Sequence, residues 1–283
     1  MDPGDLMAHV DIAEILLPAA KAGHGVGAFN VIQLEHAEAI VTAAERAGAP
    51  VVLQISENTV KFHGRLAPIG RACLAIAEAA AVPVSVHLDH ATREDLIQEA
   101  VKLGFLSVMY DGSALAYEEN VTATAAVVRW CGDFGARVEA ELGEVGGKDG
   151  VHAPGVRTDP DEAARYVAST GIHALAVAVG SSHAMLTRDA VLDNELIHDI
   201  HAAVAVPLVL HGSSGVPDDG LAAAVAAGMT KINIATHLNK ALTAAVRDRL
   251  AEDEKLVDPR KYLGPGRDAV ADQVAHLLGV LGG

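Results

Sequence analysis

The 283-residue sequence has few of the features that mark secreted, membrane-spanning or disulfide-rich proteins. It contains only two cysteines, Cys73 and Cys131, which fall far apart on predicted helices, so we expect two buried, reduced thiols and no disulfide framework. No apolar run reaches the roughly 20 residues that cross a bilayer. The acidic N-terminus lacks the basic-then-apolar order of a signal peptide. A cytoplasmic location is the resulting expectation.

Positive charge is also scarce, because 21 Lys and Arg residues face 37 Asp and Glu residues and the formal net charge is -16. Such a chain repels nucleic acids and anionic membranes at long range, so we expect neither as a partner. An anionic small molecule can bind only where the site is locally positive. A divalent cation together with backbone N–H groups would supply that positive charge.

Aromatic residues make up only 3% of the chain, and the apolar content of 51% is mostly Ala and Val. The apolar residues form short continuous runs, which are typical of parallel strands buried on both faces. Strands are predicted at 25–31, 50–56, 82–90, 107–113, 137–147, 174–183, 207–215 and 230–236. Helices are predicted at 33–47, 64–80, 93–103, 117–133, 159–170, 193–204, 217–227 and 237–252, with a last one at 268–278.

Eight strand–helix units in series favour a closed (β/α)8 TIM barrel over an open, doubly wound sheet. The open sheet would more often carry a glycine-rich turn after its first strand, whereas this turn is Phe29-Asn30-Val31-Ile32-Gln33. A chain of this length fits one such barrel, which typically takes about 250 residues. With no linker or low-complexity tract in view, residues 1–283 are predicted to be a single α/β domain with an extra C-terminal helix.

Three predicted strands end at a histidine, namely His90, His183 and His211. In a barrel of this type the strand C-termini meet at one rim, where the active site lies. Three neutral imidazoles around one cation leave an open position, which is the catalytic rather than the structural pattern for zinc. The chain has 14 histidines, so three unrelated surface histidines are the alternative. The neighbouring Asp89 and Glu141 favour the metal site.

Two small-residue segments follow the last two strands and start helices. Gly212-Ser213-Ser214-Gly215 comes directly after His211, and Asn233-Ile234-Ala235-Thr236 follows the eighth strand. These are the places where barrels commonly bind phosphate through backbone N–H groups and hydroxyls. A Gly-Ser-Ser-Gly stretch alone is more often a flexible turn, but its position favours an anion site. Asp111 is either a loop brace or a site residue, and the loop 143–154 is either a mobile lid or a plain surface loop.

These residues resemble the class II, metal-dependent ketose-bisphosphate aldolase family. The resemblance implies a (β/α)8 barrel that uses one catalytic zinc ion per subunit. It implies reversible cleavage of a ketose 1,6-bisphosphate, fructose 1,6-bisphosphate first and tagatose 1,6-bisphosphate next, to dihydroxyacetone phosphate and glyceraldehyde 3-phosphate. The motifs that carry the resemblance are Gly27-Ala28-Phe29-Asn30-Val31, His87-Leu88-Asp89-His90, the segment from Ser107 to Ser113, Glu139-Ala140-Glu141-Leu142-Gly143, His211-Gly212-Ser213-Ser214-Gly215 and Lys231-Ile232-Asn233-Ile234-Ala235-Thr236.

The resemblance also implies a role for each matching residue. His90, His183 and His211 would bind zinc, and Asp89 would act as acid and base at the C4 hydroxyl. Asp111 and Glu141 would hold the metal in an alternative position. The implied substrate-binding residues are Asn30, Ser56, Ala184, Gly212, Ser213, Ser214, Asn233, Ile234, Ala235, Thr236 and Arg260. Arg260 would reach a neighbouring subunit, so a homodimer or homotetramer is expected, and a monovalent cation is expected near the phosphate site.

Three positions depart from the family pattern. Ala184 and Ser213 stand where the family usually has glycine, and Asp149 stands where the lid usually carries a glutamate that exchanges a substrate proton. Asp149 is therefore a candidate catalytic residue that is one methylene shorter. The departures leave room for another ketose phosphate, such as an inositol-derived keto acid phosphate or a sulfo-sugar phosphate, and for a non-catalytic sugar-phosphate-binding scaffold. A barrel metal hydrolase is a further alternative, although it usually begins with His-x-His on its first strand.

Overall fold

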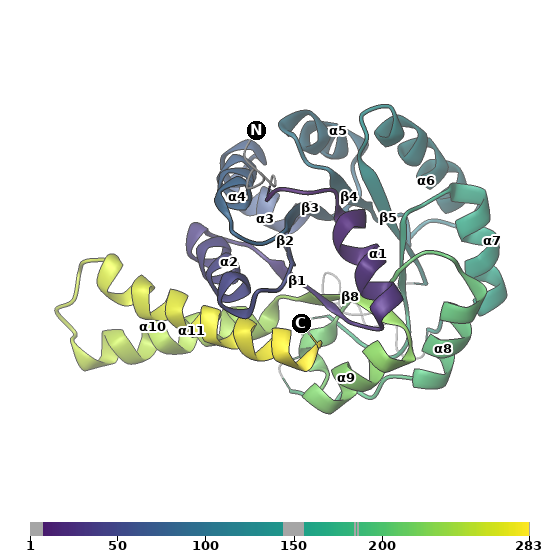
Figure 1. Ribbon diagram of the computed structural model, residues 1–283. Coiled ribbons are helices and arrows are strands. Elements are labelled where there is room, and N and C mark those ends of the chain that lie inside the picture. The colour runs from purple at the N-terminus through teal and green to yellow at the C-terminus, as the bar shows by residue number, and fades with distance from the viewer. Residues whose placement is uncertain (1–7, 144–155, 184, 186, 283) are drawn as a thin grey trace, which may run out of the picture.

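Eight parallel strands close into a barrel in the order in which they occur in the chain (Figure 1). The computed structural model describes residues 8–143, 156–183, 185 and 187–282. The barrel closes where β1 pairs with β8. The predicted (β/α)8 barrel is therefore confirmed. The strands are β1 Val26–Asn30, β2 Val51–Ser56, β3 Val84–Ala91, β4 Ser107–Tyr110, β5 Arg137–Leu142, β6 Ala174–Val177, β7 Leu208–Leu210 and β8 Met229–Ile234.

Helices surround the strands and bury their apolar faces against them (Figure 1). Local signals set their ends: α7 starts with the side chain of Asp159 accepting a hydrogen bond from the Glu162 N–H, and it ends at Gly171 in the left-handed conformation. The helices of the ring are α2 Leu34–Ala47, α4 Ala67–Ala79, α5 Glu94–Leu103, α6 Tyr117–Gly132, α7 Pro160–Thr170, α8 Asn194–Ala203, α9 Asp218–Ala227 and α10 Thr236–Glu252.

Four strands end well before the sequence predicts. The strand predicted at 107–113 ends at Tyr110, and those predicted at 137–147, 174–183 and 207–215 end at Leu142, Val177 and Leu210. Each of the last three exits contains a glycine with positive φ: Gly143 at 82°, Gly180 at 116° and Gly212 at 68°. A strand cannot continue through such a residue, because extended backbone requires negative φ. Strand pairing therefore stops before the rim of the barrel.

Two helical predictions also differ from the structure. The segment predicted as one helix at 64–80 is preceded by a separate helix α3 Glu57–His63, which Ser56 caps by accepting from the Thr59 N–H at 3.2 Å. The last helix, α11 Arg260–Val280, starts eight residues earlier than predicted and passes through Pro265. Gly266 lets α11 approach α10 closely, since a Cβ there would lie 3.0 Å from Val246. Together α10 and α11 form a hairpin that projects from the barrel (Figure 1).

An additional helix, α1 Ile12–Ala22, lies across the opening of the barrel in Figure 1 and was not predicted. This opening is the end of the barrel where the strands begin, because α1 lines a small cavity together with Arg137 and Ala174, the first residues of β5 and β6. Ile12, Ile15 and Leu16 are buried there against inward-facing residues of the strands. The helix thus seals the floor of the barrel and leaves the opposite rim for the chemistry.

The two cysteines behave as the sequence predicts. Cys73 and Cys131 are buried and form no disulfide. Burial raises the pKa of each thiol to about 12, so neither is a reactive thiolate at neutral pH. Within the described residues, none of the helices combines the length and the apolar character that a membrane span requires.

Leu16 tests the role of α1 as the floor of the barrel. Leu16→Ala should lower the free energy of unfolding by about 3 kcal/mol, because it leaves a cavity between α1 and the strands. Leu17, the next residue, is 55% exposed, so Leu17→Ala should change stability little. Denaturant unfolding measures both effects. Neither variant should alter metal content, and a loss of metal in Leu16→Ala would show that floor and rim are not independent.

Candidate active site

The three strand-end histidines converge at the rim of the barrel. His90 lies in β3, while His183 and His211 lie in the loops after β6 and β7. Their ring centroids are 5.0 Å apart for His90 and His183, 4.4 Å for His90 and His211, and 5.7 Å for His183 and His211. One ring nitrogen from each lies within 4.8 Å of the other two, so the three could hold one metal ion.

The backbone at His90 is strained. Among the described residues, His90 is the one non-glycine residue with positive φ, at 48°. The pairing of β3 with β4 also shifts register between Leu88 and Ala91. Neighbouring residues of a regular strand point to opposite faces, whereas Asp89 and His90 both line the same cavity. The irregularity therefore aims two adjacent side chains at one place, at a conformational cost of about 1–3 kcal/mol.

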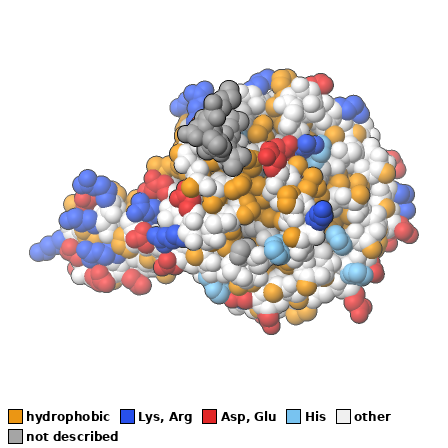
Figure 2. All heavy atoms as spheres, in the orientation of Figure 1, with side chains coloured by type: hydrophobic (Ala, Val, Ile, Leu, Met, Phe, Trp, Pro, Cys, Tyr) orange, Lys and Arg blue, Asp and Glu red, His pale blue; other side chains and the backbone are white. Residues whose placement is uncertain are grey.

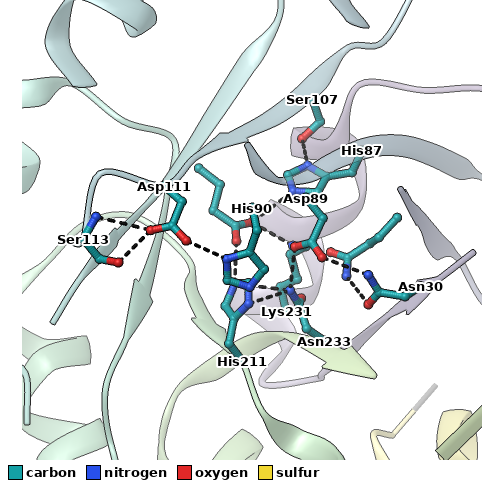
Figure 3. A network of polar contacts seen from close by, with 12 residues as sticks. Asn30, His87, Asp89, His90, Ser107, Asp111, Ser113, His211, Lys231 and Asn233 are labelled. Atoms are coloured by element: carbon teal, nitrogen blue, oxygen red, sulfur yellow. Dashed lines mark hydrogen bonds and ion pairs between the residues drawn. The ribbon is translucent and has the colours of Figure 1, made fainter. Parts of the chain in front are cut away.

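Asp111 and Glu141 lie beside His90. A carboxylate oxygen of Asp111 is 2.8 Å from Nδ1 of His90, and its other oxygen accepts from the backbone N–H and the hydroxyl of Ser113 (Figure 3). His90, Asp111 and Glu141 each offer a ligand atom within 4.8 Å of the others. The structure thus brings all five predicted metal-binding residues together in two groups that share His90.

Asp89 is buried beside the histidines and is held by two amides. Asn30 donates to one carboxylate oxygen at 2.8 Å, and Asn233 donates to the other at 3.4 Å (Figure 3). Burial alone would raise the pKa of Asp89, but the neighbouring imidazoles, Lys231 and the Asn30 hydrogen bond lower it, and the net direction is downward. Asp89 is therefore a carboxylate at neutral pH.

A cavity of about 210 Å³ opens at this rim, and the three histidines and Asp89 form part of its wall. Ser213 donates through its hydroxyl to the Asn233 carbonyl, which ties the two small-residue segments together. Gly212 is required where it stands, because a Cβ there would lie 2.6 Å from the Ser182 backbone. The predicted substrate-binding residues that line the cavity are Asn30, Ser56, Gly212, Ser213, Ser214, Asn233, Ala235 and Thr236, and Asn58 joins them.

Ile234 and Arg260, two further predicted substrate-binding residues, do not line this cavity. Ile234 is buried in β8, so only its backbone could face a ligand. Arg260 is exposed at the first turn of α11, where it pairs with Asp258 at 2.8 Å. Figure 2 shows charged side chains of both signs gathered over the α10–α11 hairpin. Ala184, Asp149 and nearly all of the predicted lid lie outside the described residues.

A buried charged pair beneath the histidines was not predicted as part of the site. Nζ of Lys231 lies 2.8 Å from Oε2 of Glu139, and Oε1 of Glu139 lies 3.0 Å from Nε2 of His211. Nδ1 of His87, which is buried beside this pair, forms a hydrogen bond with the Ser107 hydroxyl at 2.7 Å. The sequence did contain a signal for this pair. Glu139 stands two positions before Glu141, and Lys231 two positions before Asn233, so each shares a face of its strand with a predicted site residue.

The comparison with known proteins gives the family. The model of class-II fructose-bisphosphate aldolases matches residues 10–283. The chain belongs to this family. It is therefore a class II aldolase, a lyase that acts on carbon–carbon bonds.

Relatives cover nearly the whole chain. A fructose-bisphosphate aldolase of Staphylococcus aureus (strain Mu50) is 39% identical over 272 residues, which are 95% of each chain. One from Geobacillus stearothermophilus is 40% identical over 268 residues, which are 93% of each chain. The crystal structure of the YdjI aldolase from Escherichia coli K12 superimposes with a TM-score of 0.83 at 31% identity, covering 96% of this chain and 97% of that one.

Two imidazoles of this class II aldolase are held neutral by their surroundings. Burial lowers the pKa of His211 well below its usual value, with the neighbouring His90 adding to the effect. Burial also lowers the pKa of His87 well below its usual value, and Lys231 adds to it. A metal ion binds only the neutral imidazole, so the environment of His211 keeps it in the binding form.

His87 makes the stability of the metal-free protein depend on pH. Its folded pKa lies below the unfolded value near 6.5, so its contribution to stability is present above pH 6.5 and is lost as the pH falls toward the folded pKa. The slope from this one group should rise toward about 1.4 kcal/mol per pH unit as the pH falls below 6.5. In His87→Asn, urea unfolding at pH 7.5, 6.5 and 5.5 with chelator present should show a slope smaller by this amount.

His198 provides the control, because it is exposed on α8. His198→Asn makes the same change of residue type at the surface, and its stability at pH 7.5 should be close to that of the wild-type protein. Equal slopes for the wild type and His87→Asn would mean that folding does not lower the pKa of His87.

Proposed function

We propose that this class II aldolase is zinc-dependent and reversibly cleaves a ketose 1,6-bisphosphate to dihydroxyacetone phosphate and glyceraldehyde 3-phosphate. Fructose 1,6-bisphosphate is the first candidate, in line with the names of the relatives at 39–40% identity, and tagatose 1,6-bisphosphate is the next. One observation carries the proposal: three imidazoles and a buried carboxylate share one cavity with two segments suited to phosphate.

The donor set suits zinc. Three neutral imidazoles are nitrogen ligands that Zn²⁺ favours, and they leave a position open to a substrate. Asp111 contacts Nδ1 of His90, which would leave Nε2 of His90 for the metal, and Glu139 contacts Nε2 of His211, which would leave Nδ1 of His211 for it. When bound, zinc would act as a Lewis acid that stabilises the negative charge of the enediolate left by bond cleavage.

Asp89 takes the role of the base. Cleavage of the C3–C4 bond requires loss of the C4 hydroxyl proton, and an ionised carboxylate at the edge of the metal site can accept it. The hydrogen bonds from Asn30 and Asn233 fix both oxygens and favour the charged form. In the reverse direction the same carboxyl returns the proton. Asp149, in the lid, would exchange the proton of the three-carbon product.

The rest of the rim would hold the substrate. Gly212, Ser213 and Ser214, with the segment from Asn233 to Thr236, would bind the phosphate of the dihydroxyacetone half through N–H groups and hydroxyls. Asn30 and Ser56 would contact the sugar chain. Arg260 lies outside its own cavity, on the projecting hairpin, and in a homodimer or homotetramer it would bind the distal phosphate of a neighbouring subunit.

Asp89 is the sharpest test of the mechanism. Asp89→Ala should retain zinc and lose cleavage by about 100- to 10,000-fold, because the base is gone while the metal ligands remain. A coupled assay of triose phosphate release measures turnover, and elemental analysis measures zinc. Asp95→Ala, at an exposed carboxylate on α5, should be fully active. Wild-type turnover in Asp89→Ala would remove Asp89 from the mechanism.

Metal removal and a substrate panel test the reaction itself. Dialysis against a chelator should abolish triose phosphate release, and added Zn²⁺ should restore it. The panel should include fructose and tagatose 1,6-bisphosphates and other ketose phosphates, with simple esters and amides as controls. Hydrolysis of the esters without any triose phosphate would identify a metal hydrolase, and binding without turnover would identify a scaffold.

A further inference from the structure

The Glu139–Lys231 pair lies inside the barrel, where branched apolar residues are the usual occupants. Lys231 is completely buried and Glu139 is 2% exposed. Removing two charges from water is costly, and apolar residues of similar volume are often at least as stable in such a place. The pair also spans the interior of the barrel, because Glu139 comes from β5 and Lys231 from β8, which are not neighbours. Its position suggests a task other than stability.

Each oxygen of Glu139 has a different partner. Oε2 lies 2.8 Å from Nζ of Lys231, and Oε1 lies 3.0 Å from Nε2 of His211. Figure 3 shows Lys231 and His211 close together beneath the rim. Lysine can only donate hydrogen bonds, so Lys231 fixes one oxygen of the carboxylate and turns the other toward the imidazole. His87 lies on another side of the Glu139 carboxylate, with its Nε2 3.8 Å from Oε2 of Glu139.

A carboxylate at Nε2 determines where the proton of a neutral imidazole sits. The carboxylate accepts, so Nε2 must carry the proton and Nδ1 must carry the lone pair. The amide Nδ2 of Asn233 lies almost equally far from both ring nitrogens of His211, 3.1 Å from Nδ1 and 3.2 Å from Nε2, so the contact with Glu139 is the one that decides. A metal ion needs the lone pair of the ring nitrogen that faces the other two histidines.

We propose that Glu139 and Lys231 are positioning residues that set the tautomer and the orientation of His211 for metal binding. The inference rests on the proposed zinc function for its consequence, but the tautomer is a property of the metal-free protein. Neither residue touches the cavity, so both act through His211. Lys231 supports Glu139, and Glu139 supports the imidazole.

Zinc affinity of three variants separates this role from simple charge balance. In Glu139→Gln, an amide with one oxygen and one NH2 group replaces the two carboxylate oxygens. The NH2 group must face either Lys231 or Nε2 of His211, and both of these are donors in the native arrangement. Zinc affinity should therefore fall about 10- to 100-fold. Glu139→Gln with Lys231→Met is neutral and lets the amide oxygen accept from His211, so affinity should return close to that of the wild type. Glu139→Leu with Lys231→Met is equally neutral but has no acceptor, and it should bind as weakly as Glu139→Gln.

The affinity is measured on metal-free protein by competition with a chelator, and the absorption spectrum of the Co²⁺ form reports the ligand geometry. Arg137→Met is the matched control, because Arg137 also lies on β5 but pairs with Asp11 at the floor of the barrel, 2.9 Å away. Its zinc affinity and Co²⁺ spectrum should be those of the wild type. Equal affinities for the two neutral double variants would overturn the proposal.

A direct measurement on the wild-type protein is independent of how any variant folds. Two-dimensional ¹⁵N–¹H NMR of histidine-labelled, metal-free protein distinguishes the two tautomers of His211, with His211→Asn used only to assign the signals. The Nε2–H form is expected, and the Nδ1–H form would overturn the inference. Failure of the wild type to bind zinc would instead refute the proposed function and leave the tautomer result standing.

Discussion

Eight parallel strands that close on themselves must all end at the same rim, and every candidate chemical group in this protein depends on that closure. His90, His183 and His211 come from positions spread over more than a hundred residues of chain. Their rings meet because β3, β6 and β7 all finish at the rim of one closed barrel, around a single opening. The floor of the barrel is closed by α1 and is apolar, so stability and chemistry are assigned to opposite ends of the same strands.

Charge is arranged at the rim in a way that favours a cation. Asp89, Glu139 and Glu141 are all nearly inaccessible to water, and the buried Lys231 pairs with Glu139. Burying so many carboxylates is unfavourable unless positive charge is nearby. A divalent ion held by the three imidazoles would offset that negative charge and, in a chain of net charge -16, would also attract a phosphate-bearing substrate.

Much of the fold could be predicted from local pattern. Continuous apolar runs marked all eight strands, and the absence of a glycine-rich turn after the first favoured the closed barrel over an open sheet. The errors fell where local pattern and tertiary context disagree. The strands predicted to continue past Leu142, Val177 and Leu210 end at those residues, and a glycine with positive φ lies within three residues of each end. Pro265 suggested a loop, yet packing against α10 holds the helix through it. Helix α1 has no strand of its own and was missed.

The sequence by itself determined which residue types stand at the strand ends, and hence the candidate ligands, base and phosphate segments, because strand period and barrel geometry fix the rim positions. Only the tertiary structure decided how they are oriented. The positive φ of His90 and the contact between Glu139 and Lys231, 92 residues apart, depend on register and closure. Hydrogen bonds across the interior of a barrel join residues from different strands, and the local order of residues in one strand carries no record of which distant side chain it will meet.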